Sequence, residues 1–170
     1  MIEIRTERPE DIGAIREVNE RAFGGPAEAM LVDLLRAANK AVVSLVAQWD
    51  DRVVGHILFS PVTVANSPES FRAAGLAPMS VLPEYQNQGI GSQLVRDGMA
   101  ACCEGGFDIV VVLGHVPFYP RFGFVPAERH GLSNEYGASD AFMVLELKSG
   151  ALTGISGLVK YSHEFREADC

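Results

Sequence analysis

The feature that most constrains the fold is a junction in the middle of the chain, where a short apolar segment meets an amphipathic one. The letters "GLAPMSVL" predict a strand at about residues 76–82, and the glycine-containing stretch "PEYQNQGIGS" follows it. The next letters, "QLVRDGMAACCEGG", repeat with helical spacing and predict a helix from about residue 89 to 104. The run "FDIVVVLG" is continuously apolar, which is typical of a strand covered on both faces. This order predicts a strand–helix–strand crossover.

The segments on either side of this centre predict a mixed α/β or α+β domain with an antiparallel first half. Apolar stripes with helical spacing occur in residues 8–23 and 27–38, and residues 41–64 have the pattern of a hairpin that turns at Asp50-Asp51. We find no repeat and no linker, so we expect residues 1–170 to form a single domain. The remaining strands are expected at residues 2–5, 141–148 and 158–161.

Composition narrows the possible partners and the compartment. The 170 residues carry a net charge of −8, with a pI near 4.9, which disfavours nucleic acid or an anionic membrane as the main partner. No apolar run approaches the roughly 20 residues of a membrane-spanning helix, and residues 1–12 lack the pattern of a secretory signal. The cysteines, Cys102, Cys103 and Cys170, have neither metal-ligand spacing nor a disulfide pattern. We therefore expect a cytoplasmic protein with no metal.

The glycine loop predicts a site for a phosphate-like anion. A strand that passes through a tight loop into a helix points unpaired main-chain N–H groups at one spot, where the helix dipole adds positive potential. Gly89 and Gly91 leave that spot open. The loop lacks the lysine of a P-loop, and Leu94 stands where a dinucleotide-binding fingerprint needs its third glycine. A pair of turn glycines without a ligand is the alternative.

The motif Gln-x-x-Gly-x-Gly, formed by Gln86, Gly89 and Gly91 after "VLPEY", resembles the acetyl-CoA pyrophosphate loop of the GNAT-type N-acetyltransferase superfamily. Together with "VLGHVPFYPRFGF" and "GLVKY", it makes the chain similar to a bacterial branch of predicted N-acetyltransferases. The resemblance implies a GNAT-like central twisted mixed sheet with a strand–loop–helix acetyl-CoA site. It also implies acetyl transfer from acetyl-CoA to a primary amine of a small molecule or protein, by direct attack in a ternary complex.

The resemblance also assigns binding residues. Residues of the central strand would pair through their backbone with the pantetheine arm, and the N–H near Val81 would stabilise the oxyanion. Gln86 stands where many members of the superfamily have arginine, which removes a possible charge contact. The implied pantetheine residues are Met79, Ser80 and Val81, and the implied pyrophosphate residues are Asn87, Gln88, Gly89, Ile90, Gly91 and Ser92.

Two residues are candidates for proton transfer. Tyr119 matches the tyrosine that protonates the leaving thiolate in many members, although it could instead be one of three stacked aromatic residues with Phe118 and Phe122. His115 follows the second apolar strand, and the ordinary pKa of histidine suits a general base. The base stays open, because a water chain or another side chain could serve. The other candidates are Glu28, His56 and Glu84.

Two further functions remain possible from the sequence. A non-catalytic acyl-CoA-binding sensor would keep the fold and lack a base, and a nucleotide-binding module would use the same loop for ATP. The resemblance adds the expectation of a possible homodimer.

Overall fold

The computed structural model describes residues 1–170, which form two compact units. Unit 1 consists of residues 1–60, 77–98 and 163–170, and unit 2 of residues 61–76 and 99–162. The expectation of one domain stays a prediction. Three elements contribute residues to both units: β3 (Arg52–Val64), β4 (Ala73–Val81) and α3 (Ile90–Glu104).

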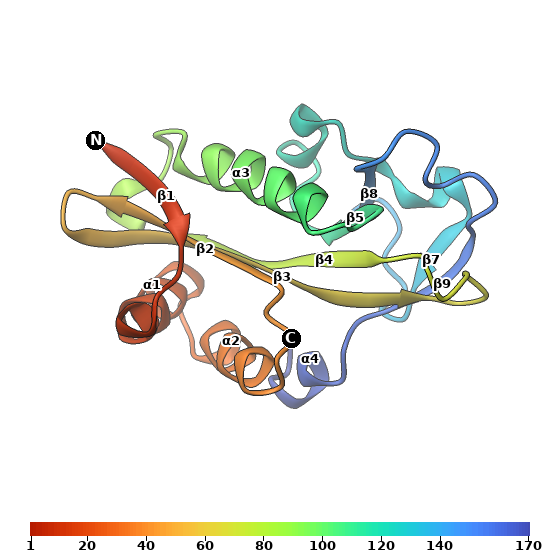
Figure 1. Cartoon of the computed structure of the whole chain (residues 1–170). Helices are drawn as coiled ribbons and strands as arrows, with labels where there is room; N and C mark the ends of the chain where they lie inside the picture. Colours follow the sequence, from red (N-terminus) through yellow and green to blue (C-terminus); the bar gives the residue numbers. More distant parts are fainter. The chain divides into compact units, whose positions relative to one another are not determined.

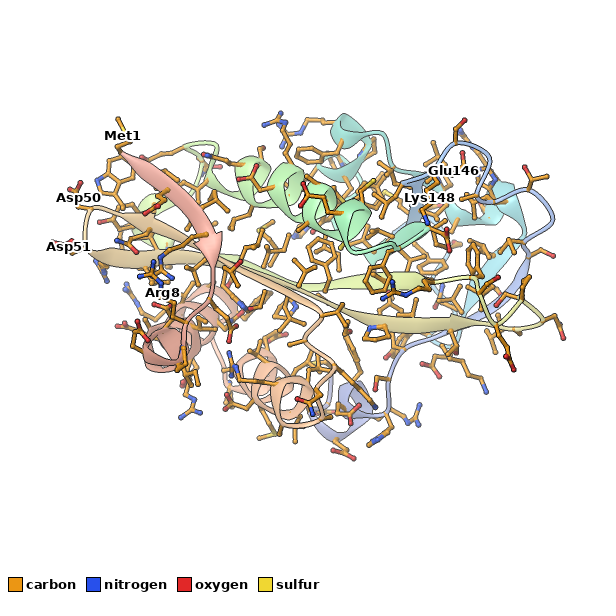
Figure 2. All side chains as sticks on the ribbon, viewed as in Figure 1. Met1, Arg8, Asp50, Asp51, Glu146 and Lys148 are labelled. Atoms are coloured by element: carbon orange, nitrogen blue, oxygen red, sulfur yellow. The ribbon has the colours of Figure 1, made fainter.

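Unit 1 contains the predicted antiparallel first half. β1 (Ile2–Thr6) pairs antiparallel with β2 (Val43–Trp49), and β2 pairs antiparallel with β3. The predicted hairpin is confirmed: Asp50 takes the left-handed conformation, with φ 53°, and Figure 2 shows Asp50 and Asp51 at the tip. The other elements of unit 1 are α1 (Ile12–Phe23), α2 (Ala27–Ala37) and α4 (Glu164–Glu167).

Helices cover both faces of the unit 1 strands. Figure 1 shows α1 and α2 on one face and α3 on the other. The stripe of α1 buries Ile15 and Val18, as its spacing predicts. On the opposite face, Gly98 of α3 lets the helix approach β3, because an added Cβ would lie 2.5 Å from the ring of Phe59.

Unit 2 contains the predicted crossover strand. β5 (Ile109–Leu113) pairs parallel with residues 73–76 of β4, and its first four residues are almost fully buried. β8 (Phe142–Glu146) pairs antiparallel with β5, and Figure 2 labels its last residue, Glu146, and Lys148, two residues further along the chain. Lys148 forms an ion pair with Asp108, just before β5, at 3.1 Å. The other strands of unit 2 are β6 (Val125–Pro126), β7 (Leu132–Asn134) and β9 (Gly157–Lys160).

Some boundaries differ from those that the sequence predicts. β4 begins at Ala73 rather than Leu76, because its small residues allow a close approach: an added Cβ at Gly75 would lie 2.8 Å from Val62 Cγ1. The polar tail ends in α4, which buries Phe165, and Glu164 of this helix forms an ion pair with Lys40 at 2.9 Å. None of the helices combines the length and apolarity needed to cross a membrane.

Candidate active site

The glycine loop lies at the end of β4 in unit 1 and is exposed. After a 3-10 turn at Pro83–Tyr85, the chain takes left-handed conformations at Asn87 (φ 62°) and Gly89 (φ 84°). Turns of this kind bring successive main-chain N–H groups to one side, which suits an anion. An added Cβ at Gly89 would meet no atom within 4 Å, so the space in front of this residue is open to a ligand.

The first turn of α3 supplies the donors. Gln93 N donates to Gly89 O at 3.1 Å, which is the helical hydrogen bond that spans this turn. The N–H groups of Ile90, Gly91 and Ser92 precede it, so they have no carbonyl one turn earlier in the helix. Together with the positive end of the helix dipole, they form a main-chain site that a diphosphate fits.

Gln86 has a structural role that the sequence does not reveal. Its Nε2 donates to Val81 O at 3.0 Å, so the residue in the arginine position links the loop to the end of β4. Leu82, the residue after Val81, donates its N–H to Val54 O on β3 at 2.8 Å. Peptide groups alternate in direction along a strand, so the N–H of Val81 points away from β3.

Two of the candidate bases lie in environments unsuited to that role. Glu84 forms a bidentate ion pair with Arg21 at 2.9 and 2.8 Å, which lowers the pKa of its carboxyl group. His56 is 0% exposed, and burial lowers its pKa to about 4, so its imidazole is neutral and enclosed. Glu28 lies in the first turn of α2.

Unit 2 brings His115 and Tyr119 together in one turn. His115 O accepts hydrogen bonds from Phe118 N at 3.0 Å and Tyr119 N at 3.4 Å, and the side chain of His115 is exposed. Tyr119 is 6% exposed, and burial raises its pKa to about 12, so it is protonated at neutral pH. Its ring makes edge contacts with Phe118 and Phe124, at centroid distances of 5.0 and 5.6 Å.

Two other side chains of unit 2, Cys102 and Arg121, have plain structural surroundings. Burial raises the pKa of the Cys102 thiol to about 12, which makes this residue a packing side chain rather than a nucleophile. The guanidinium of Arg121 lies over the ring of Phe118, 4.6 Å from its centre.

The structure thus groups the predicted residues in two places. Unit 1 contains the end of β4 and the glycine loop, and unit 2 contains the proton-transfer candidates. The sequence missed a set of buried polar side chains in unit 1, which includes Asn19 and Ser44. No periodicity marks them, because each comes from a different element. The predicted residues of unit 1 are Met79, Ser80, Val81, Asn87, Gln88, Gly89, Ile90, Gly91 and Ser92, and those of unit 2 are His115 and Tyr119.

Comparison with known proteins gives consistent matches. The family model described as acetyltransferase (GNAT) domain matches residues 3–127. The uncharacterized N-acetyltransferase YhbS of Escherichia coli K12 is 40% identical over 164 residues, which are 95% of this chain and 97% of that protein. The crystal structure of E. coli YhbS in complex with CoA has a TM-score of 0.91 at 37% identity, over 97% of this chain and 92% of that one. A GNAT family acetyltransferase from Brucella melitensis, in complex with acetyl-CoA, has a TM-score of 0.80 at 37% identity, over 97% and 98% of the chains.

Proposed function

The chain is an acetyltransferase of the GNAT family, and we propose that it transfers the acetyl group of acetyl-CoA directly to a primary amine in a ternary complex. The acceptor is an amine of a small molecule or a protein. The observation that carries the proposal is the open main-chain site at Gly89, where a left-handed backbone leads into the N-terminus of α3 and leaves room for a diphosphate. The similar crystal structures with CoA and acetyl-CoA support the choice of cosubstrate.

Main-chain groups would bind acetyl-CoA in this proposal. The N–H groups of residues 87–92 hold the pyrophosphate, and residues 79–81 of β4 pair with the pantetheine arm. The N–H of Val81, which points away from β3, donates to the oxygen that becomes negative during attack. In other enzymes, one such donor contributes about 3–4 kcal/mol to the stabilisation of the transition state.

Two side chains would move protons. Tyr119 donates its phenolic proton to the departing CoA thiolate and regains a proton from solvent, and its raised pKa keeps it protonated at neutral pH before the next turnover. His115 accepts the proton that the amine loses, either directly or through water. The exposure of His115 supports this choice over His56 and Glu84, which are enclosed and ion-paired respectively.

The test measures acetyl-CoA binding and then turnover. Calorimetry with acetyl-CoA should give one binding event, and acetyl-CoA should raise the melting temperature. Incubation with a panel of small amines and lysine peptides should release free CoA thiol only when a suitable amine is present.

A matched pair of glycine substitutions gives the control. Gly89→Glu places a carboxylate in the open space and should abolish binding. Gly154→Glu makes the same change at another left-handed glycine with open space (φ 76°) and should leave binding intact. Absence of acetyl-CoA binding by the wild type would refute the proposal. Binding without turnover on any amine would favour an acyl-CoA sensor, and stabilisation by ATP alone a nucleotide-binding module.

A further inference from the structure

Unit 1 contains a chain of buried polar side chains that the proposed chemistry does not use. It begins at Ser80 on β4, which is 3% exposed, and reaches Asn19 on α1 and His56 on β3, which are both 0% exposed. It continues to Ser44 on β2 and ends at Glu7, just after β1. Five separate segments of unit 1 therefore contribute one side chain each.

The hydrogen bonds of this chain all run in one direction. Ser80 Oγ donates to Asn19 Oδ1 at 2.9 Å, and Asn19 Nδ2 donates to His56 Nδ1 at 3.3 Å. Since an amide nitrogen only donates, Nδ1 accepts and the proton of the neutral imidazole is on Nε2. His56 Nε2 then donates to Ser44 Oγ at 2.9 Å, and Ser44 Oγ donates to Glu7 Oε1.

The chain of hydrogen bonds is fixed at Asn19 and at its far end, Glu7. Asn19 Nδ2 also donates to Ile15 O at 3.0 Å, so a flipped amide would place two oxygens against each other. At the far end, the carboxylate of Glu7 accepts from Arg36 Nε at 2.9 Å and from Arg36 Nη2 at 3.1 Å. The chain therefore holds Ser80 in one orientation.

Stability alone does not explain such a chain. Each member, if left unpaired, would cost the desolvation of a buried polar group, whereas apolar residues of similar volume would pack as well or better. A fully paired network does specify geometry, because only one arrangement satisfies every donor and acceptor. The geometry it fixes here is the end of β4.

We infer that the Ser80–Asn19 hydrogen bond positions the N–H of Val81 for acetyl transfer, which makes Asn19 and Ser80 positioning residues of the reaction. Ser80 immediately precedes Val81, and the buried chain holds its side chain against α1. The inference rests on the proposed function, because it concerns the carbonyl of bound acetyl-CoA.

The test needs no acceptor amine. Acetyl-CoA that is isotope-labelled at the thioester carbonyl is bound to the protein, and the carbonyl stretch is measured by difference infrared spectroscopy. A donated hydrogen bond polarises the carbonyl and lowers its frequency relative to free acetyl-CoA. We expect a clear lowering in the wild type and loss of at least half of that shift in Ser80→Ala. Ser80→Cys, which keeps the volume but has only a weak donor, should lie between the two and provides a second variant if Ser80→Ala folds poorly.

The matched control is Ser60→Ala. Ser60 is another buried serine of unit 1, and its Oγ has no hydrogen-bond partner, so the same atom is removed without loss of a bond. Its carbonyl shift should equal that of the wild type, and calorimetry should show that all variants bind acetyl-CoA.

The outcomes separate this inference from the proposed function. If the wild type does not bind acetyl-CoA, the function and the inference both fail. If it binds, but Ser80→Ala keeps the full carbonyl shift, or Ser60→Ala loses as much, only the positioning role is refuted. A wild type that binds without any carbonyl shift also refutes the positioning role.

Discussion

The glycine loop, residues 86–91 of unit 1, has an exposed first part at residues 86–89 and offers main-chain N–H groups, whereas the aromatic turn, residues 118–124 of unit 2, is packed around the buried rings of Tyr119 and Phe124. An added Cβ at Gly89 would enter open space, but one at Gly114, beside the aromatic turn, would overlap the ring of Tyr119. Function in the loop therefore depends on backbone conformation. Function in the turn depends on the packing of particular side chains.

This difference predicts which substitutions should impair each region. A main-chain site tolerates most changes of side chain and fails when its backbone or its open space changes. A site built from a packed side chain fails when that side chain loses its polar group or when the residues packed around it change. Predictions at Tyr119, Gly114, Gly89 and Gln86 test this contrast between the loop and the turn.

The largest effect is expected at the aromatic turn. Tyr119→Phe keeps the ring and its packing but removes the acid, so kcat should fall at least about a hundredfold, in the range of general acid catalysis. The affinity for acetyl-CoA should stay close to that of the wild type, because the loop is unchanged. Steady-state kinetics by thiol release and calorimetry measure the two quantities.

The pH dependence of kcat and a substitution at a second tyrosine serve as controls for Tyr119→Phe. Burial raises the pKa of Tyr119 to about 12. At every pH up to about 10, ionisation of this tyrosine should therefore leave kcat of the wild type unchanged. Tyr136→Phe, at a residue of unit 2 that is 42% exposed, should leave kcat unchanged. An unchanged kcat in Tyr119→Phe would remove the tyrosine from the mechanism.

The next effect extends the comparison to two histidines, the buried His56 of unit 1 and the exposed His115 of unit 2. The unfolded chain binds a proton at His56 near pH 6.5, whereas the folded protein resists protonation down to about pH 4. Stability from this group is therefore present above pH 6.5 and is lost as pH falls toward 4, by about 3 kcal/mol in total. Urea unfolding at a series of pH values measures the loss.

His56→Gln is the variant that isolates the pH-dependent contribution of His56 to stability. Although it starts from a lower stability, it should lack most of the slope above pH 5. Carboxyl groups with a lowered pKa, such as that of Glu7, lose their contribution only below their unfolded value of 4.5, so they leave this window clear. His115→Gln, at an exposed side chain, is the matched control for the loss of a histidine. Equal slopes in His56→Gln and the wild type would contradict the assignment.

The sequence predicted the fold because periodicity and turn residues are local signals. The hairpin, the crossover and the helix after the glycine loop are confirmed, and the similar structures confirm the GNAT-like fold. The start of β4 was missed, because Ala73, Ala74 and Gly75 have weak strand propensity and are ordered by tertiary packing.

The site was predicted unevenly for a related reason. The loop has a motif at fixed spacing, so its residues could be named, and their roles stay predictions. The Gln86–Val81 bond and the chain from Ser80 to Glu7 join residues from different elements, so spacing in the sequence does not reveal them. The ion pair that occupies Glu84 likewise comes from Arg21, which lies far from it in the sequence.

A smaller effect comes from the same substitution in the two regions. Gly114→Ala should destabilise the protein by about 2 kcal/mol, the usual cost of overpacking, and lower kcat by displacing Tyr119. Its affinity for acetyl-CoA should not change. Gly89→Ala should destabilise by about 1 kcal/mol, since its φ of 84° strains any other residue, and it should instead weaken acetyl-CoA binding. Denaturant unfolding measures the stability of both variants, and calorimetry measures their affinity for acetyl-CoA. An equal loss of affinity in both variants would contradict the contrast between the loop and the turn.

The smallest effect is expected at Gln86, whose side chain forms a hydrogen bond from the loop to β4. Gln86→Ala removes the bond to Val81 O, which should cost about 1 kcal/mol, the net value of one hydrogen bond. This hydrogen bond joins the loop to β4, so its loss should loosen the loop and weaken acetyl-CoA binding several-fold. Gln93→Ala, at an exposed glutamine one turn into α3, is the control and should bind as the wild type does. If Gln86→Ala also binds like the wild type, the backbone of the loop holds its shape without this link, and main-chain conformation alone accounts for the site.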